Sequence, residues 1–256
     1  MTHAERKPIL IMHHPYHTEG AARPARWLVT CDHATNVVPE FVGGGSLGIS
    51  STDMGRHIAW DVGAAGVARA LAAALDGPVI ASNFSRLVID PNRGEDDPTL
   101  VMKLYDGTVI PANRHVSEAD LARRLNRLYR PYHSAIADLA ARRDDTVMVA
   151  LHSFTPQLRG RPPRPWHIAL LYAADTRLAH PLIARLRAEP DLCIGANEPY
   201  GGHLPGDSIA RHAIAYERPN VLIEIRNDLI TTPEAQAAWA ARLAPILHEV
   251  ADRAGV

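Results

Sequence analysis

The chain has 256 residues, of which 46% are hydrophobic, and its formal net charge at pH 7 is -1. This length and composition suit one domain with a sizeable core. Because the charge is nearly balanced and no basic block stands out, we expect no nucleic-acid partner. The longest apolar runs fall far short of the roughly 20 residues of a membrane-spanning helix, so we expect no membrane insertion.

Residues 1–26 are rich in His, Pro and charge and are expected to form a polar N-terminal arm. Their one apolar run, ILIM at 9–12, does not resemble the apolar region of a secretory signal. We therefore expect a cytoplasmic location, with Cys31 and Cys193 as buried thiols rather than a disulfide. Residues 27–256 are expected to form the single folded domain.

Strand-like and helix-like segments alternate along this domain. The predicted strands are residues 27–31, 79–82, 87–90, 146–151, 167–172 and 221–225, and the predicted helices are 59–75, 118–142, 176–187 and 233–251. Ser117 suits the N-cap of the second helix, which Pro131 is expected to kink. Thr232 and Pro233 suit the cap and first position of the last helix.

This alternation predicts an α/β fold, in which a mostly parallel, mixed central sheet is covered by helices on both faces as a three-layer α/β/α sandwich. The long polar loop between the strand at 87–90 and Asn113 exceeds an ordinary connection and is expected to bind a ligand.

Four polar sites each follow an apolar run in a separate part of the sequence. They are His33, the pair Asn92 and Arg93, His152 and Glu224. In an open α/β sheet the carboxyl ends of the strands meet at one edge, where ligands bind. Two imidazoles, a guanidinium and a carboxylate at such an edge suit a hydrolase that holds a metal and a substrate anion.

His33 and His152 are candidate zinc ligands because each lies where an apolar strand becomes polar. A catalytic zinc site usually has three protein ligands and an open position for water, so two histidines do not complete it. Among the 14 histidines of the chain, a hydrogen-bonded histidine without a metal is the alternative for either one.

Glu224 shares a strand face with Leu222 and Arg226, because side chains alternate along a strand. A buried carboxylate is costly unless it is paired. Glu224 therefore either pairs with Arg226 or faces a functional cavity, where burial would raise its pKa and suit it to act as a general base.

Asn92 and Arg93 suit the binding of a substrate carboxylate, because the planar guanidinium binds carboxylates in bidentate fashion. The same segment is rich in turn formers, and Arg93 could instead pair with Glu95 or Asp96.

Taken in order, these residues resemble the zinc carboxypeptidase superfamily, which has a phosphorylase/hydrolase-like fold. More closely, the chain resembles the N-formylglutamate amidohydrolase family over about residues 27–229. The motifs that carry this resemblance are DHATNVVP at 32–39, SR at 85–86 with NR at 92–93, HSFTP at 152–156 and NEPY at 197–200.

The resemblance implies release of formate from N-formyl-L-glutamate, as in histidine breakdown, with one Zn²⁺ per chain and a small anionic N-acyl amino acid as substrate. His33 and His152 would hold zinc, and a water with its pKa lowered to about 7 would attack the formyl group. Glu224 would be the catalytic base. Asn92 and Arg93 would bind the substrate carboxylate, and Arg86 would be a second cation for substrate charge or the oxyanion.

The resemblance also leaves a gap. Asn36 stands where the carboxypeptidase pattern has a glutamate ligand, so the third ligand must come from elsewhere. Asp61, beside the start of the Ala-rich helix, is our choice; a carboxylate favoured by the helix dipole is the alternative for it, and Asp32 is the reserve ligand. Tyr200, or His203 in the same loop, is expected to contact substrate.

Other functions stay open at this point. A zinc peptidase or a deacylase with a different N-acyl substrate would use the same residues. A non-catalytic binding protein would keep Asn92 and Arg93 as an anion-binding pair but would have a degenerate metal site. A nucleophilic Ser153 ranks below these, because the sequence around it lacks a nucleophile elbow.

Overall fold

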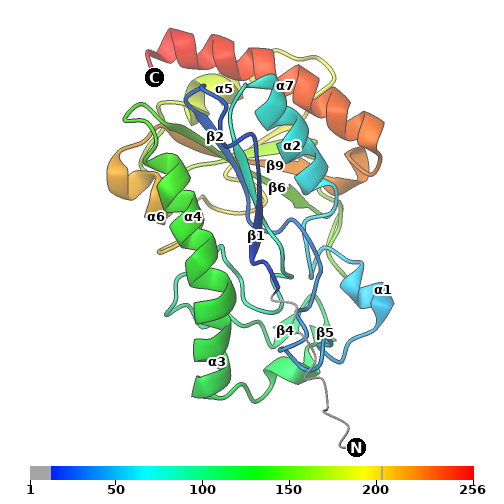
Figure 1. Cartoon of the computed structure of the whole chain (residues 1–256). Helices are drawn as coiled ribbons and strands as arrows, with labels where there is room; N and C mark the ends of the chain where they lie inside the picture. The colour runs from blue at the N-terminus through cyan, green and yellow to red at the C-terminus, as the bar shows by residue number, and fades with distance from the viewer. Residues whose placement is uncertain (1–12, 203) are drawn as a thin grey trace, which may run out of the picture.

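Figure 1 shows the computed structural model of the chain, which describes residues 13–202 and 204–256. The strands of its main sheet are β1 (Tyr16–Glu19), β2 (Trp27–Cys31), β3 (Val79–Ser82), β6 (Val147–Phe154), β7 (Ile168–Leu171), β8 (Ile194–Ala196) and β9 (Asn220–Arg226). Their order across the sheet is β1-β3-β2-β6-β9-β7-β8. The four central strands β3, β2, β6 and β9 run parallel, whereas β1 and β7 are antiparallel to their neighbours β3 and β9.

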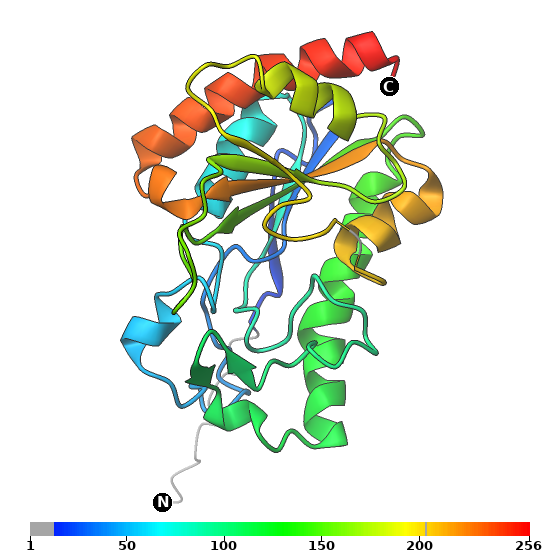
Figure 2. The ribbon, with the colours of Figure 1, turned by 180° about the vertical axis from the view of Figure 1, so that it is seen from behind.

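Helices cover both faces of this sheet, as Figures 1 and 2 show from opposite sides. The helices of the described residues are α1 (Ser51–Met54), α2 (Ala64–Ala74), α3 (Glu118–Arg124), α4 (Arg130–Ala140), α5 (Ala179–Leu186), α6 (Ser208–His212) and α7 (Pro233–Ala254). Single turns lie at η1 (Pro111–Asn113), η3 (Ile214–Tyr216) and η4 (Asn227–Leu229), and β4 (Leu104–Tyr105) and β5 (Thr108–Val109) form a separate hairpin. The mixed, mostly parallel three-layer α/β fold predicted from the sequence is confirmed.

Side-chain alternation along the strands divides the core into two clusters. In β2, Trp27, Val29 and Cys31 pack with α2, α5 and α7 on one face, while Leu28 packs with α4 and α6 on the other. Because central parallel strands are buried on both faces, their sequences are mostly apolar until near the carboxyl end of the sheet. A polar side chain that follows such a strand therefore emerges at that edge.

Several predicted elements are confirmed with small shifts in their ends, but the helix predicted for 59–75 begins only at Ala64, as α2. Ser117 caps α3 by accepting from the Asp120 backbone N–H, and Thr232 caps α7, whose first residue is Pro233. The helix predicted for 118–142 is interrupted by a π-helical turn, η2 (Leu125–Tyr129). This interruption directly precedes Pro131, which lacks the N–H of a regular helix.

The strand predicted for 87–90 is wrong. Residues 86–88 form a turn, closed by a hydrogen bond of 2.9 Å from the Val88 N–H to the Ser85 carbonyl. Leu87, Val88 and Ile89 are apolar because they fill the core cluster beneath α4, not because they belong to the sheet.

The N-terminal segment also differs from the expectation of an arm. Residues 16–19 form the edge strand β1, which pairs with β3 from Tyr16 opposite Ser82 to Glu19 opposite Val79. An edge strand with one exposed face does not need an apolar sequence, so composition gave no sign of it. The apolar run at 9–12 lies outside the described residues.

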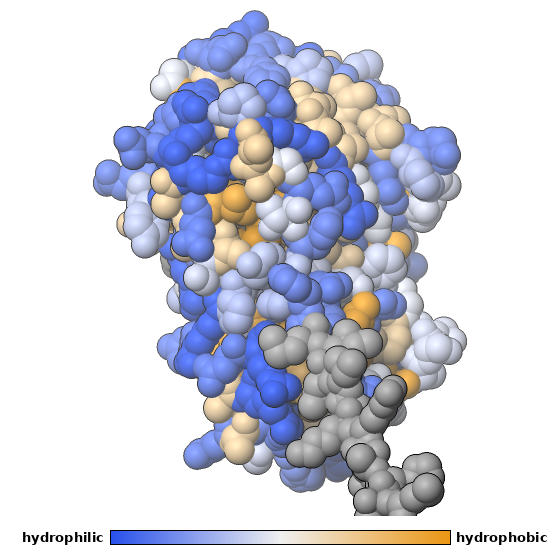
Figure 3. All heavy atoms as spheres, in the orientation of Figure 1, coloured by the Kyte–Doolittle hydropathy of each residue, from blue (hydrophilic) through white to orange (hydrophobic). Residues whose placement is uncertain are grey.

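Both cysteines are free, as expected, although Cys193 is only half-buried. Among the helices that the structure describes, none combines the length and apolar character needed to cross a membrane. On the face shown in Figure 3, hydrophilic side chains predominate and the more hydrophobic ones lie in small groups.

Candidate metal centre and substrate cleft

The candidate site lies at the carboxyl ends of β2, β6 and β9. His33 follows β2 by two residues, while His152 and Glu224 stand opposite each other in the β6–β9 register. Both belong to the sheet face of Ala150 and Leu222, which pack beneath α4 and α6. The ends of these neighbouring strands therefore bring the three residues together from separate parts of the chain.

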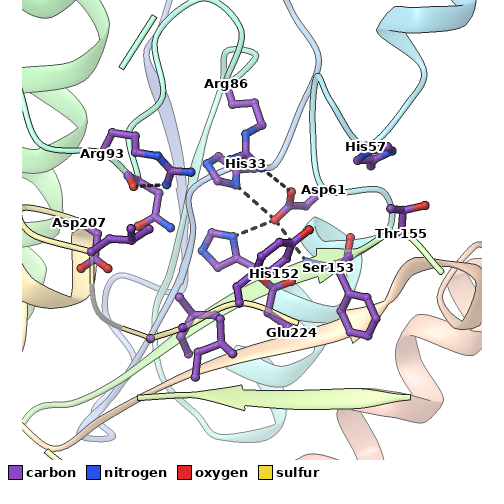
Figure 4. Close-up of a pocket in the computed structure, with 18 of the residues that line it drawn as sticks. His33, His57, Asp61, Arg86, Arg93, His152, Ser153, Thr155, Asp207 and Glu224 are labelled. Carbon is purple, nitrogen blue, oxygen red and sulfur yellow. Dashed lines mark hydrogen bonds and ion pairs between the residues drawn. The ribbon is translucent and has the colours of Figure 1, made fainter. Parts of the chain in front are cut away.

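His33, His152 and Asp61 form a buried group, shown in Figure 4. The Nδ1 atoms of His33 and His152 lie 3.3 and 2.8 Å from the same carboxylate oxygen, Asp61 Oδ2. One ligand atom from each residue lies within 4.8 Å of the other two. Three donors from three segments thus converge on one point.

Each imidazole is oriented by a further carboxylate at its other nitrogen. His33 Nε2 donates to Asp90 Oδ1 at 2.7 Å, and His152 Nε2 lies 3.4 Å from Asp32 Oδ2. Tyr132 in turn donates to the other oxygen of Asp32 at 2.7 Å. Although burial opposes ionisation, the close contact and charge of His152 lower the pKa of Asp32 to about 2.

This arrangement fits a zinc ion. Two imidazoles and one carboxylate are a common catalytic zinc ligand set, and ligands about 2.0 Å from a tetrahedral ion lie about 3.3 Å apart. A carboxylate at the far nitrogen of each histidine is the usual outer support of zinc-ligating histidines. Although burial would raise the pKa of Asp61, the imidazoles lower it below its usual range, so this carboxyl is ionised.

The three candidates for the third ligand, Asp61, Asp32 and Asn36, make different contacts in the structure. Asp61 lies two residues before the N-cap of α2, Gly63, but its carboxylate contacts the histidines and the Ser153 N–H rather than the helix N-terminus. Asp32 contacts the far nitrogen of His152, and Asn36 donates to the Met54 carbonyl.

Glu224 faces the cleft and does not pair with Arg226, which donates to Asp228 instead. Its Oε2 is buried and has no hydrogen-bond partner among the described residues. Burial, reinforced by the negative charge of Asp61 and opposed by His152, raises the pKa of Glu224 to about 7. A carboxyl with such a pKa exchanges protons near neutral pH.

Arg86 lines the cleft, but its charge is shared with acids. Its Nε and Nη2 donate to Asp90 Oδ2 at 3.2 and 2.8 Å, and its Nη1 lies 3.5 Å from Asp61 Oδ1. Although burial disfavours the cation, these two carboxylates raise the pKa of Arg86 above its usual range. Arg86 is therefore a fixed donor beside the group of His33, Asp61 and His152 rather than a free cation.

Asn92 and Arg93 stand at the other wall of the cleft. Arg93 donates to the Asn92 carbonyl and to Thr99, and no described acid lies within ion-pair distance of it, so it does not pair with Glu95 or Asp96. The Asn92 side-chain oxygen accepts from the Ser208 N–H at the start of α6. Arg93 keeps its charge available for an anionic ligand.

The cleft encloses a cavity of about 300 Å³. Its lining joins the residues above with His57, Tyr105, Ser153, Phe154, Thr155, Leu171, Tyr200, Gly201, Gly202, Leu204, Asp207 and Leu222. Tyr105 comes from the β4–β5 hairpin within the long loop, and Tyr200 also lines the cavity. The Ser153 hydroxyl donates to the Val62 carbonyl, so His152 does not activate it. His203 lies outside the described residues.

Sequence reasoning missed Asp90 and Tyr132. Asp90 ends the apolar run that precedes Asn92, and this position was the available signal for it. Tyr132 lies 100 residues from Asp32 in the sequence and reaches it only because α4 packs under the sheet, so no local signal existed.

Comparison with known proteins agrees with this architecture. The sequence model of the N-formylglutamate amidohydrolase family matches residues 25–231. The crystal structure of gene product Atu2144 from Agrobacterium tumefaciens is similar at 33% sequence identity, with a TM-score of 0.89 over 96% of this chain and 98% of that chain. The crystal structure of N-formylglutamate amidohydrolase from Ralstonia eutropha JMP134 shares the fold at 24% identity, with a TM-score of 0.56 over 94% of this chain and 99% of that chain. No curated protein matches the chain. Because the family model spans most of the sequence, the chain belongs to the N-formylglutamate amidohydrolase family, whose members are hydrolases that act on an amide.

Proposed function

We propose that this protein is a zinc-dependent hydrolase that removes the formyl group from N-formyl-L-glutamate. The observation that carries the proposal is the buried group of His33, Asp61 and His152, beside a carboxyl of raised pKa and within reach of an unpaired arginine. The family supports the reaction and the substrate.

His33, His152 and Asp61 would hold the ion. When bound, zinc supplies Lewis acidity that makes water nucleophilic near neutral pH. Asp90 and Asp32 fix the orientation of the two imidazoles, and outer carboxylates of this kind strengthen the metal affinity of the histidines they contact.

Glu224 is the proposed general base and acid. Because its pKa is raised to about 7, its ionised form takes a proton from the attacking water and its neutral form gives that proton to the departing nitrogen. The reaction adds a water across the C–N bond: the hydroxyl joins the formyl carbon and the proton joins the nitrogen. The products are formate and glutamate.

Substrate binding is proposed for Asn92 and Arg93, which would hold the carboxylate next to the acylated nitrogen. Arg86 is already fixed by Asp90 and Asp61, so its remaining N–H groups can stabilise the oxyanion without further ordering. Tyr200, which lines the cavity, would contact the substrate.

The test is hydrolysis of N-formyl-L-glutamate, followed by the release of formate. The proposal expects turnover by the zinc-loaded protein, its loss after chelation and its return when zinc is added. Chelator-insensitive turnover would contradict the metal role, and the absence of turnover by fully loaded protein would contradict the substrate. A protein that binds N-formyl-L-glutamate without cleaving it would be the non-catalytic alternative.

A further inference from the structure

Arg93, which lines the substrate cleft, and Arg164, which contacts residues of its wall, have no acidic partner among the residues that the structure describes, and the mechanism uses only Arg93. We propose that the second, Arg164, together with Tyr200, forms a subsite for a second carboxylate of the substrate. This inference rests on the proposed function, since it assigns the recognition of a dicarboxylic N-acyl amino acid to the same cleft.

The contacts of Arg164 hold its guanidinium in place without neutralising it. Nη1 donates to the Thr155 carbonyl at 3.1 Å and Nη2 donates to the Tyr200 hydroxyl at 2.9 Å. The guanidinium carbon lies 4.9 Å from the centre of the Tyr200 ring and 5.7 Å from that of Phe154. Thr155, Tyr200 and Phe154 all line the cavity, so the guanidinium of Arg164 lies directly behind three residues of its wall.

The other arginines near this wall are already paired with acids. Arg56 contacts Asp53 and Asp106, and Arg86 contacts Asp90 and Asp61. For Arg164, as for Arg93, the residues described in the structure offer no acid within ion-pair distance, which is 4.0 Å. A half-buried cation with neutral partners favours the binding of an anion.

Tyr200 supplies the hydrogen-bond donor of this subsite. Its oxygen accepts from Arg164, which leaves its own proton free to donate into the cavity. Burial raises its pKa to about 12, so the hydroxyl keeps that proton at neutral pH. The nearby His57 adds no positive charge, because burial lowers its pKa to about 4.

Arg93 and Arg164 mark opposite ends of the cleft. In Figure 4, Arg93 lies on one side of the group of His33, Asp61 and His152, and Thr155 lies on the other side. Since Arg164 donates to the Thr155 carbonyl, its charge belongs to that other side. A substrate held by both arginines would therefore span the group of His33, Asp61 and His152, with its amide beside that group.

The second carboxylate can come from the side chain of the amino acid or from a longer acyl group. The experiment separates these sources with two matched pairs: N-formyl-L-glutamate against N-formyl-L-glutamine, and N-succinyl-L-alanine against N-butyryl-L-alanine. Wild type, Arg164→Gln, Tyr200→Phe and the control Arg161→Gln are compared by kcat/KM. Arg161 is an exposed arginine of the same loop, so its loss changes the net charge but not the subsite.

We expect Arg164→Gln to lower kcat/KM for the charged member of one pair by about 10- to 100-fold, the effect of losing a charged hydrogen bond, and to change its neutral partner by less than about twofold. Tyr200→Phe should also lower kcat/KM for the charged member of that pair, and Arg161→Gln should leave kcat/KM unchanged for both pairs. The pair that responds identifies the source. An equal loss for charged and neutral members would show a structural role only and overturn the subsite, as would no loss at all.

Binding measured without turnover keeps this test separate from that of the proposed function. By calorimetry, wild type should bind glutarate more tightly than butyrate, and Arg164→Gln should remove that difference. If no amide is hydrolysed but the glutarate preference depends on Arg164, the proposed function fails and the subsite stands. If amides are hydrolysed but neither measurement depends on Arg164, the subsite fails alone.

Discussion

Lowering the pH should destabilise the fold through a buried pair of histidines, His133 and His212, close to Asn92. His133 Nδ1 lies 2.8 Å from His212 Nε2, and His133 Nε2 contacts the Pro91 carbonyl, next to Asn92. Burial lowers the pKa of both imidazoles, and for His133 the charge of His212 lowers it further. Their pKa values fall from 6.5 to about 3 for His133 and about 4 for His212, so both are neutral in the folded protein near pH 7.

The sign of the effect follows from proton binding. Between the folded and unfolded pKa values, the unfolded chain binds more protons, so the free energy of unfolding rises with pH. The stability that the two neutral histidines contribute is complete well above pH 6.5 and is lost as the pH falls towards 4. At pH 5, about 1.5 units below the unfolded pKa, each histidine lowers the free energy of unfolding by about 2 kcal/mol, because one pKa unit corresponds to about 1.4 kcal/mol. The pair should therefore cost about 4 kcal/mol relative to pH 8.

Urea unfolding between pH 5 and pH 8 measures this cost when wild type is compared with His212→Gln. The contributions of other titrating groups, among them His57 and His152, to the pH dependence of stability cancel in the difference between the two proteins. The glutamine retains a hydrogen-bonding group for His133 but cannot titrate. The stability of the variant should fall by about 2 kcal/mol less than that of wild type on going from pH 8 to pH 5. An identical pH dependence in the two proteins would refute the claim that His212 is buried in its neutral form.

Three further substitutions test the roles proposed in the cleft. Glu224→Gln should keep zinc while kcat falls by about 100- to 10,000-fold, the range for loss of a general base, and an unchanged rate would remove Glu224 from the mechanism. Arg93→Gln should raise KM for N-formyl-L-glutamate by about tenfold or more with zinc content unchanged, because a charged hydrogen bond to the substrate is lost; an unaltered KM would place the carboxylate elsewhere. Asp90→Asn should weaken zinc binding by about 10- to 100-fold in a chelator competition, because Asp90 supports His33, whereas wild-type affinity would contradict that support.

The fold and the gathering of the site could be predicted from sequence because both follow from local pattern. Central parallel strands are mostly apolar, so a polar residue soon after one, such as His33, is expected at the sheet edge. The strand face of Glu224 followed from simple alternation in the same way. Its choice between Arg226 and a cavity did not, because that depended on where Asp228 lies.

What the sequence could not give depends on contacts between distant segments. The run at 87–89 is apolar like a strand, but packing beneath α4 makes it a buried turn. The free charge of Arg164 was invisible, because only the structure shows which arginines have acidic partners. The neutral pair of His133 and His212 likewise arises from the packing of α4 against α6, which periodicity does not reveal.

The central claim is that His33, Asp61 and His152 hold one zinc ion. Anomalous X-ray diffraction recorded on either side of the zinc absorption edge, from crystals of the purified protein, tests it directly. We expect a single strong peak between the two Nδ1 atoms and Asp61 Oδ2, which is lost in crystals of Asp61→Asn. A zinc-loaded crystal with its peak at other residues, or with none at this group, would contradict the account.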